Sequence, residues 1–218
     1  MELKGKKIAF LGDSITEGVG VSCVENTYWS LLARKTGAQC FGYGIGGTRI
    51  APQLHPSPEP RWDLYFGSRV EEMADGMDVV VVFGGTNDFG HGDADMGSMS
   101  DRGEKTFYGS FHELILKLIR KYPGADIVLM TPLHRVGDED CSFNEFGVRR
   151  QSNLEGYADA IRRIAAYYGI PVLDLFRTSG IQPNVPELME TFAPDGLHPN
   201  DTGHERMCQR LIGFLSGL

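Results

Sequence analysis

A run of five consecutive apolar residues, Val79 to Phe83, is the strongest constraint on the fold of this chain. Four of the five are valine, a β-branched residue that is enriched in strands. A strand that is half exposed alternates apolar and polar residues, whereas a strand without alternation is buried on both faces. The run therefore predicts a strand in a parallel sheet that is covered by helices, as in α/β folds.

The rest of the chain alternates in the same way between short apolar runs and stretches of helical periodicity. Asp201 is expected to cap the last helix or to place a negative charge in its first turn. No repeat or linker interrupts this order, so we expect a single domain over residues 1–218. The expected strands are 8–11, 39–43, 79–83, 126–130 and 172–175, and the expected helices are 28–35, 63–74, 107–121, 153–168 and 201–215.

Three long segments between these elements read as loops. Residues 51–61 are rich in proline, residues 89–103 are rich in small and polar residues, and residues 133–147 are polar with scattered aromatic residues. Ligands of open parallel sheets bind beyond the carboxyl ends of the strands. Since long loops in compact domains usually carry function, we expect these three to surround a ligand site.

The composition excludes some classes of partner and cofactor. The net charge of −8 comes without any basic stripe, which argues against binding to nucleic acid or to anionic membranes. The longest apolar run is too short to cross a bilayer, and the first residues do not resemble a signal peptide. We therefore expect a cytoplasmic protein, although a secreted chain without its leader would look the same. Its four cysteines form no C-x-x-C pair, so neither a zinc site nor a redox motif is expected.

The segment Asp195-Gly196-Leu197-His198 carries an aspartate three residues before a histidine. On a short turn, the carboxylate can hold the imidazole in one tautomer and stabilise its protonated form. This is the acid–base half of a hydrolytic triad. It requires a nucleophile and a set of oxyanion donors elsewhere in the chain.

Ser14 is the candidate nucleophile, because Gly12-Asp13-Ser14-Ile15 falls where the first strand should end. Its hydroxyl can point into a crevice at the carboxyl edge of the sheet. An equally simple interpretation makes Ser14 a helix cap, with Glu17 completing a capping box of the form S-x-x-E. The motif is not the G-x-S-x-G elbow of α/β-hydrolases, because Thr16 stands where the second glycine should be.

Two glycine-rich turns are candidates for the oxyanion donors. Residues 44–49 follow the second expected strand, and residues 84–88 follow the third. A glycine N–H can approach an oxyanion closely, and the amide of Asn87 can donate without carrying a charge. A glycine-rich turn of this kind, taken alone, more often does no more than end a strand. Neither turn matches a phosphate-binding motif.

Together, these four segments resemble the SGNH (GDSL) hydrolase superfamily over nearly the whole chain. The resemblance implies a three-layer α/β/α fold of the flavodoxin-like type, with a central parallel sheet of about five strands. It also implies a serine esterase that uses no metal or organic cofactor. By that resemblance, Ser14 is the nucleophile, His198 the general base and acid, and Asp195 the residue that orients His198.

The same resemblance assigns the oxyanion hole to the N–H groups of Ser14 and Gly47 and to the amide of Asn87. The second motif departs from the family pattern at two positions. Family members often have asparagine where Gly42 stands and serine where Gly46 stands. Two adjacent glycines leave the donor open between Gly46 and Gly47, and we favour Gly47.

The substrate is less constrained than the reaction. The loops carry aromatic and polar residues side by side, which suits a short acyl ester of a sugar-like alcohol. Lysophospholipases and thioesterases, transfer of the acyl group to another acceptor, and a non-catalytic carbohydrate-binding module remain as alternatives. The oligomeric state stays open, and the expected partner is a small-molecule ester. Candidate substrate-binding residues are Asp13, Gly46, Phe89, His91 and His134.

Three further histidines have simpler interpretations. His112 lies in an amphipathic helix and is expected to pack or to face solvent. His204 is expected to be structural or exposed near the start of the last helix, and His55 lies in the proline-rich loop. No pair of histidines has metal-site spacing with acidic partners, so no metal is expected.

Overall fold

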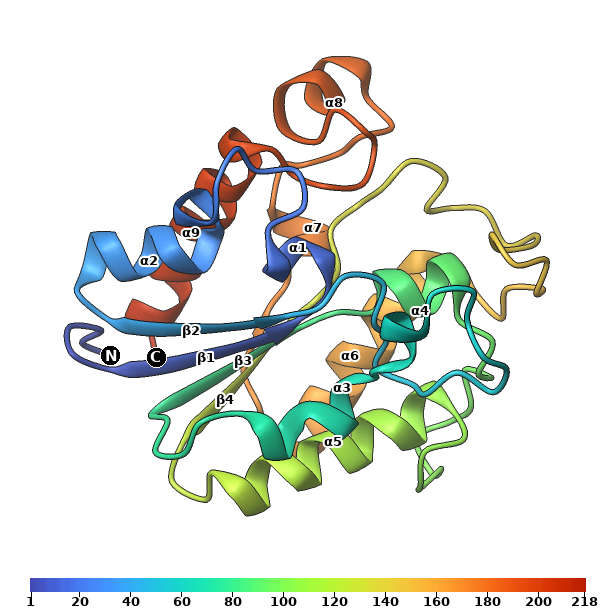
Figure 1. The fold of residues 1–218 in the computed structure, drawn as a ribbon, viewed down its shortest axis with the longest axis horizontal. Coiled ribbons are helices and arrows are strands. Elements are labelled where there is room, and N and C mark those ends of the chain that lie inside the picture. The colour runs from blue at the N-terminus through green and yellow to red at the C-terminus, as the bar shows by residue number, and fades with distance from the viewer.

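The computed structural model describes all 218 residues and contains one sheet of five parallel strands (Figure 1). The strand order is β2-β1-β3-β4-β5, with all neighbours parallel. The parallel five-stranded sheet of the sequence analysis is thereby confirmed. The strands are β1 Lys7–Gly12, β2 Gln39–Gly44, β3 Val79–Phe83, β4 Asp126–Met130 and β5 Val172–Leu173.

Helices cover both faces of the sheet, so the molecule has three layers (Figure 1). One face packs against α2 (Tyr28–Thr36) and α9 (Asp201–Ser216), and the other against α3 (Phe66–Arg69), α5 (Phe107–Lys121) and α6 (Leu154–Tyr168). Alternate valines of β3 belong to the two separate cores, Val79 and Val81 to one and Val80 and Val82 to the other. This two-sided burial is the physical reason for the uninterrupted apolar run.

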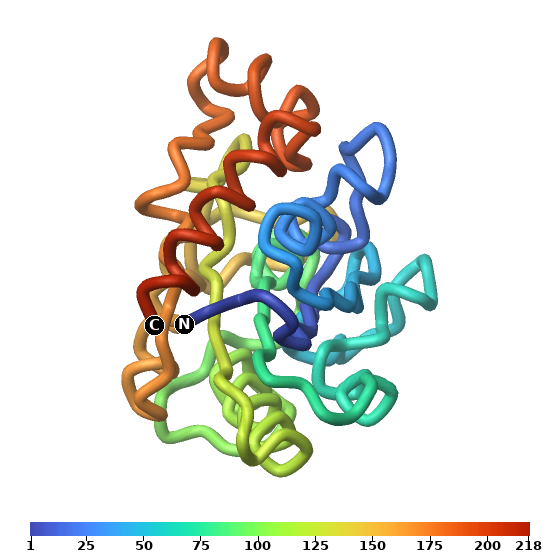
Figure 2. The backbone as a smooth tube through the Cα atoms, turned by 90° about the vertical axis from the view of Figure 1, so that its left-hand side faces the viewer, coloured from blue at the N-terminus to red at the C-terminus, as the bar shows by residue number.

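The remaining helices are short and lie in the connections between these elements. The two ends of the chain lie side by side, as Figure 2 shows, and the ammonium of Met1 donates to the carbonyl of Leu215 at 3.1 Å. No helix is both long and apolar enough to cross a membrane. The short helices are α1 Ser14–Glu17, α4 Thr86–His91, α7 Leu175–Thr178 and α8 Pro186–Phe192, with 3₁₀ turns η1 Val24–Asn26, η2 Pro60–Asp63 and η3 Val70–Glu72.

The long elements match the sequence patterns closely. The strands 79–83 and 126–130 and the helix 107–121 have the predicted bounds. Asn153 caps α6 instead of starting it, and Asn200 caps α9, so Asp201 is the first helical residue and not the cap. Helix α9 begins at Asp201 as predicted, and the one-residue shift at the start of α6 follows from which polar side chain reaches the free N–H groups.

Three predictions about shorter elements were wrong. Residues 63–74 do not form one helix, because the N–H of Phe66 donates to the carbonyl of Arg49 and breaks the segment into η2, α3 and η3. The last strand ends at Leu173, because Asp174 caps α7 directly after it. The sequence predicts a turn and a loop where helix α4 lies, because its six residues are too few to display a helical period.

Candidate active site

Ser14 lies at the carboxyl end of β1, as predicted, and begins helix α1. The capping-box interpretation is wrong, because Asp13 is the cap and accepts from the N–H of Ile15 at 3.0 Å. Glu17 accepts instead from the N–H of Gly46 at 2.7 Å. The hydroxyl of Ser14 is therefore free to bond to Nε2 of His198, with Oγ and Nε2 3.0 Å apart.

His198 is held by the turn that also carries Asp195. The carboxylate of Asp195 accepts from the backbone N–H groups of Leu197 and His198 at 2.8 and 2.7 Å. Its second oxygen lies 2.7 Å from Nδ1 of His198. Partial burial alone would raise the pKa of Asp195, but the bonds from His198 and Leu197 outweigh it and lower that pKa. The ionised carboxylate keeps the proton on Nδ1, which leaves Nε2 as a base for Ser14.

The structure also distinguishes Gly46 from Gly47, the two adjacent glycines of the second motif, by the partners of their N–H groups. The N–H of Gly46 is occupied by Glu17, whereas no acceptor of the chain reaches the N–H of Gly47. Gly47 has a φ of +76°, and a Cβ there would lie 2.2 Å from Cδ1 of Trp62. A glycine is therefore required at this position, and its N–H is the one available to a ligand.

Asn87 and the backbone of Ser14 supply two further free donors. The side-chain nitrogen of Asn87 donates one hydrogen to the carbonyl of Thr48 at 3.0 Å and keeps a second. The N–H of Ser14 is the first in α1 and has no partner in the chain. Both residues line the same cavity as Gly47 and His198.

The cavity around Ser14 is open and has a volume of about 350 Å³. Charged and aromatic side chains from the connecting segments and from α1 and α4 form most of its wall. Trp62, His91 and Arg135 are among the aromatic and polar residues that the sequence suggests for the substrate, whereas Glu17, Arg61 and Glu145 were not identified individually. Arg61 pairs with Glu17 at 2.7 Å, and Arg135 lies 3.5 Å from Glu145. The residues that complete the lining are Glu17, Val19, Gly46, Arg61, Trp62, His91, Arg135, Glu145 and Leu197.

Arg69 and Asp88 form a buried polar floor behind the oxyanion donors. Arg69 donates to the carbonyls of Tyr43 and Gly12 and to the hydroxyl of Thr48 at 2.7, 3.0 and 3.0 Å. Burial lowers the pKa of Arg69 to about 10, opposed by the charge of Asp13. Sequence reasoning missed Arg69, although a cation among the apolar residues of 63–74 was a usable signal.

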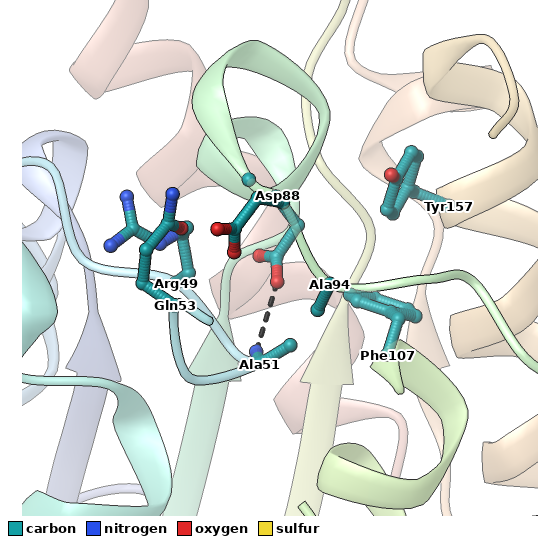
Figure 3. Close-up of a pocket in the computed structure, with 9 residues that line it drawn as sticks. Arg49, Ala51, Gln53, Asp88, Ala94, Phe107 and Tyr157 are labelled. Carbon is teal, nitrogen blue, oxygen red and sulfur yellow. Dashed lines mark hydrogen bonds between the residues drawn. The ribbon is translucent and has the colours of Figure 1, made fainter. Parts of the chain in front are cut away.

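Asp88 fixes the next part of the same turn. Its two oxygens accept from the N–H groups of Ile50 and Ala51 at 3.0 and 2.9 Å, and Figure 3 shows the second of these bonds. In that view, Arg49 lies on one side of the carboxylate and Tyr157 on the other. Burial raises the pKa of Asp88 to about 6, while the two backbone bonds oppose that shift. The turn that carries Gly47 is therefore held from behind by two buried charged side chains.

The predicted substrate-binding residues divide into two groups. Gly46 and His91 line the cavity. Asp13, which is 1% exposed, caps α1 beneath it, and Phe89 is buried in the core against Tyr157. His134 pairs with Asp138 and packs against Phe176 at a tilt in a separate cleft. In the structure, Asp13, Phe89 and His134 therefore do not line the cavity around Ser14, because each side chain is used elsewhere.

The other histidines occupy positions away from Ser14. His112 and His204 are fully buried, and His204 accepts from the N–H of Tyr28. His55 is exposed and bonds to Asp93. No group of three or more histidine, cysteine or acidic side chains is arranged to hold a metal ion.

Comparison with known proteins gives consistent similarities. A model described as the GDSL-like Lipase/Acylhydrolase family matches residues 10–206. One solved structure is 31% identical, with a TM-score of 0.85, over 100% of this chain and 99% of its own. A protein from Lactobacillus plantarum is 30% identical, with a TM-score of 0.81 over 98% of each chain. An acetyl xylan esterase, AlAXEase, is 26% identical, with a TM-score of 0.64, over 95% of this chain and 98% of its own. No curated protein matches in sequence.

Proposed function

The chain belongs to the GDSL-like lipase/acylhydrolase family and is a carboxylic ester hydrolase, and we propose that it removes short acyl groups, chiefly acetyl, from a carbohydrate or similar polar alcohol. One observation carries the proposed mechanism. Within one cavity, Oγ of Ser14 lies 3.0 Å from Nε2 of His198, whose Nδ1 lies 2.7 Å from Asp195. This is the order of contacts that a serine nucleophile requires.

The proposed reaction has two steps. Ser14 attacks the ester carbonyl while Nε2 of His198 takes the hydroxyl proton, and the N–H groups of Ser14 and Gly47 and the amide of Asn87 receive the oxyanion. His198 then gives that proton to the departing alcohol, which leaves an acyl group on Ser14. Water, deprotonated by His198, attacks the acyl-enzyme; the bond between the acyl group and Oγ of Ser14 then breaks, and His198 returns the proton to Oγ as the acid leaves.

The character of the cavity supports a small acyl group on a polar alcohol. Most of its lining residues are charged or polar, and only Val19, Trp62 and Leu197 are hydrophobic. Trp62 and Phe146 lie nearly parallel, 6.2 Å apart, beside His91. Aromatic rings next to hydrogen-bonding groups suit the apolar faces and hydroxyls of a sugar ring. The similarity to an acetyl xylan esterase agrees with this choice.

Two measurements test the proposal. A fluorophosphonate probe should label Ser14 in the unmodified protein and leave a Ser14→Ala variant unlabelled. A chain-length series of p-nitrophenyl esters should give the highest kcat/KM for acetate. A preference for octanoate would favour a lysophospholipase or thioesterase, and failure to label Ser14 would favour a binding module without catalysis.

A further inference from the structure

His91 is presented to the cavity by the same helix that carries Asn87. The two residues are four apart in α4, and both line the cavity around Ser14. Residues at this spacing lie on one face of a helix, with Cβ atoms about 5–6 Å apart. A group bound by His91 therefore lies about one helical turn from the oxyanion that Asn87 would receive.

Arg49 determines which ring nitrogen of His91 carries the proton. Nη1 of Arg49 lies 2.6 Å from Nδ1 of His91. A guanidinium can only donate, so Nδ1 must accept and the proton must be on Nε2. Arg49 is itself 1% exposed and anchored by Ser57 and Asp63, so it cannot turn away.

The environment also keeps this imidazole neutral. Burial is the largest influence and lowers the pKa of His91 to about 4, and the charges of Arg49 and Arg135 act in the same direction. At neutral pH, His91 is thus an uncharged ring with one N–H donor. An uncharged donor suits an uncharged oxygen, such as a hydroxyl or a ring oxygen.

The donor atom of His91 is unused within the chain. No acceptor of the protein bonds to Nε2 of His91, and unlike the Nε2 atoms of His112 and His204 it is not sealed in the interior. The ring itself packs against both Trp62 and Phe146, with centroids 5.0 and 5.5 Å away. These contacts fix the direction in which the N–H points.

We propose that His91 determines specificity for carbohydrate esters, by donating a hydrogen bond from Nε2 to a hydroxyl oxygen next to the acetyl group on the alcohol part of the substrate. This inference rests on the proposed function. An acetyl group has no acceptor beyond its own carbonyl, so an oxygen one helical turn from the oxyanion must belong to the alcohol. Trp62, which lines the cavity and packs on Phe146, supplies the apolar surface against which the same sugar ring lies.

The test compares two esters in three proteins. One substrate is a mono-acetylated methyl pyranoside. The other is its deoxy analogue, in which one hydroxyl next to the acetyl group is replaced by hydrogen. A separate deoxy analogue is used for each such hydroxyl. The proteins are the wild type, His91→Phe and His91→Gln. Phenylalanine keeps an aromatic ring but has no donor, whereas glutamine can accept from Arg49 and still present an amide N–H.

We expect the wild type to prefer the hydroxyl-bearing ester at one position by about tenfold in kcat/KM, the effect of one hydrogen bond. His91→Phe should reduce this ratio to about one, and His91→Gln should restore most of it. The thermal midpoint and fluorophosphonate labelling of Ser14 report whether each variant keeps its fold and its nucleophile.

The outcomes separate this inference from the proposed function. An unchanged hydroxyl-to-deoxy ratio in His91→Phe overturns the role of His91 and leaves carbohydrate deacetylation standing. A wild type without such a preference at any position has the same consequence. A wild type that hydrolyses p-nitrophenyl acetate but no acetylated pyranoside overturns both proposals.

Discussion

The two sides of the candidate site are built in opposite ways. On the base side, Asp195 is half exposed, and its carboxylate bonds only within residues 195–198. On the oxyanion side, Arg69 is buried and ties together residues from the ends of β1 and β2 and from the following turn. The first arrangement is local and solvated, whereas the second is nonlocal and buried.

This difference predicts how each side responds to substitution. Removing a half-exposed group from a short turn costs the fold little, because water replaces the lost partner. Removing a buried charge leaves other buried polar groups without partners, which is costly. Variants of the base side should therefore lose activity alone, and variants of the oxyanion side should lose both activity and stability.

The largest expected effect is that of His198→Ala. It removes the general base, and we expect kcat to fall by about 10⁴-fold or more, because losses of this size follow removal of a triad member. The thermal midpoint should change little. Steady-state kinetics and thermal unfolding measure the two quantities. Asp195→Asn is the matched control and should also lose activity without losing stability; a large drop in its midpoint would contradict the local character of this side.

Asn87→Ala should have the next largest effect on activity. Loss of one oxyanion donor lowers kcat by about 100- to 1,000-fold. The same change leaves the carbonyl of Thr48 without its partner, at about 1–3 kcal/mol of unfolding free energy. Urea unfolding and kinetics on p-nitrophenyl acetate measure both losses. A variant with full activity would remove Asn87 from the oxyanion hole.

Arg69→Met should have a smaller effect on activity and a larger one on stability. It leaves three acceptors and the nearby Asp13 without a cation, and breaking such buried interactions costs about 3–5 kcal/mol. Because the turn that carries Gly47 loses one of its supports, we expect kcat to fall about tenfold. Arg69→Lys keeps the charge but cannot reach three acceptors at once, so it should recover only part of the stability. An Arg69→Met variant with the stability of the wild type would show that Arg69 does not support the turn that carries Gly47.

The same contrast explains what could be predicted from the sequence. The Asp195–His198 turn was identified because its geometry depends on spacing along four residues. Ser14, Gly47 and Asn87 line one cavity with His198, as expected of residues that follow parallel strands ending at one edge. Arg69 was missed because its partners are 21 to 57 residues away in sequence. Phe89 and His134 were misplaced for the same reason, since no local pattern tells a loop side chain that packs inward from one that lines a cavity.

The smallest expected effect concerns pH and tests the burial contrast directly. Burial raises the pKa of Asp13 to about 7 from 3.8, partly opposed by the N–H of Ile15 and the charge of Arg69. Between these values, the native state holds a proton that the unfolded state has lost. The stability that Asp13 contributes is therefore complete below about pH 4 and is lost as the pH rises to about 7.

Asp13→Asn keeps an acceptor for Ile15 and removes the titration. The difference in thermal midpoint between wild type and variant should shift against the wild type by several °C from pH 4 to 7 and then level off. Subtraction of the two profiles cancels Asp88, whose raised pKa acts in the same direction, and His91 and His204, whose lowered pKa values act in the opposite one. Asp195→Asn should leave the profile almost unchanged in this range, because the lowered pKa of Asp195 makes its contribution constant above about pH 4, so that it changes only in more acid solution, and solvent screens it. Equal profiles for both variants would mean that the two carboxylates, one buried and one half exposed, do not differ as their surroundings require.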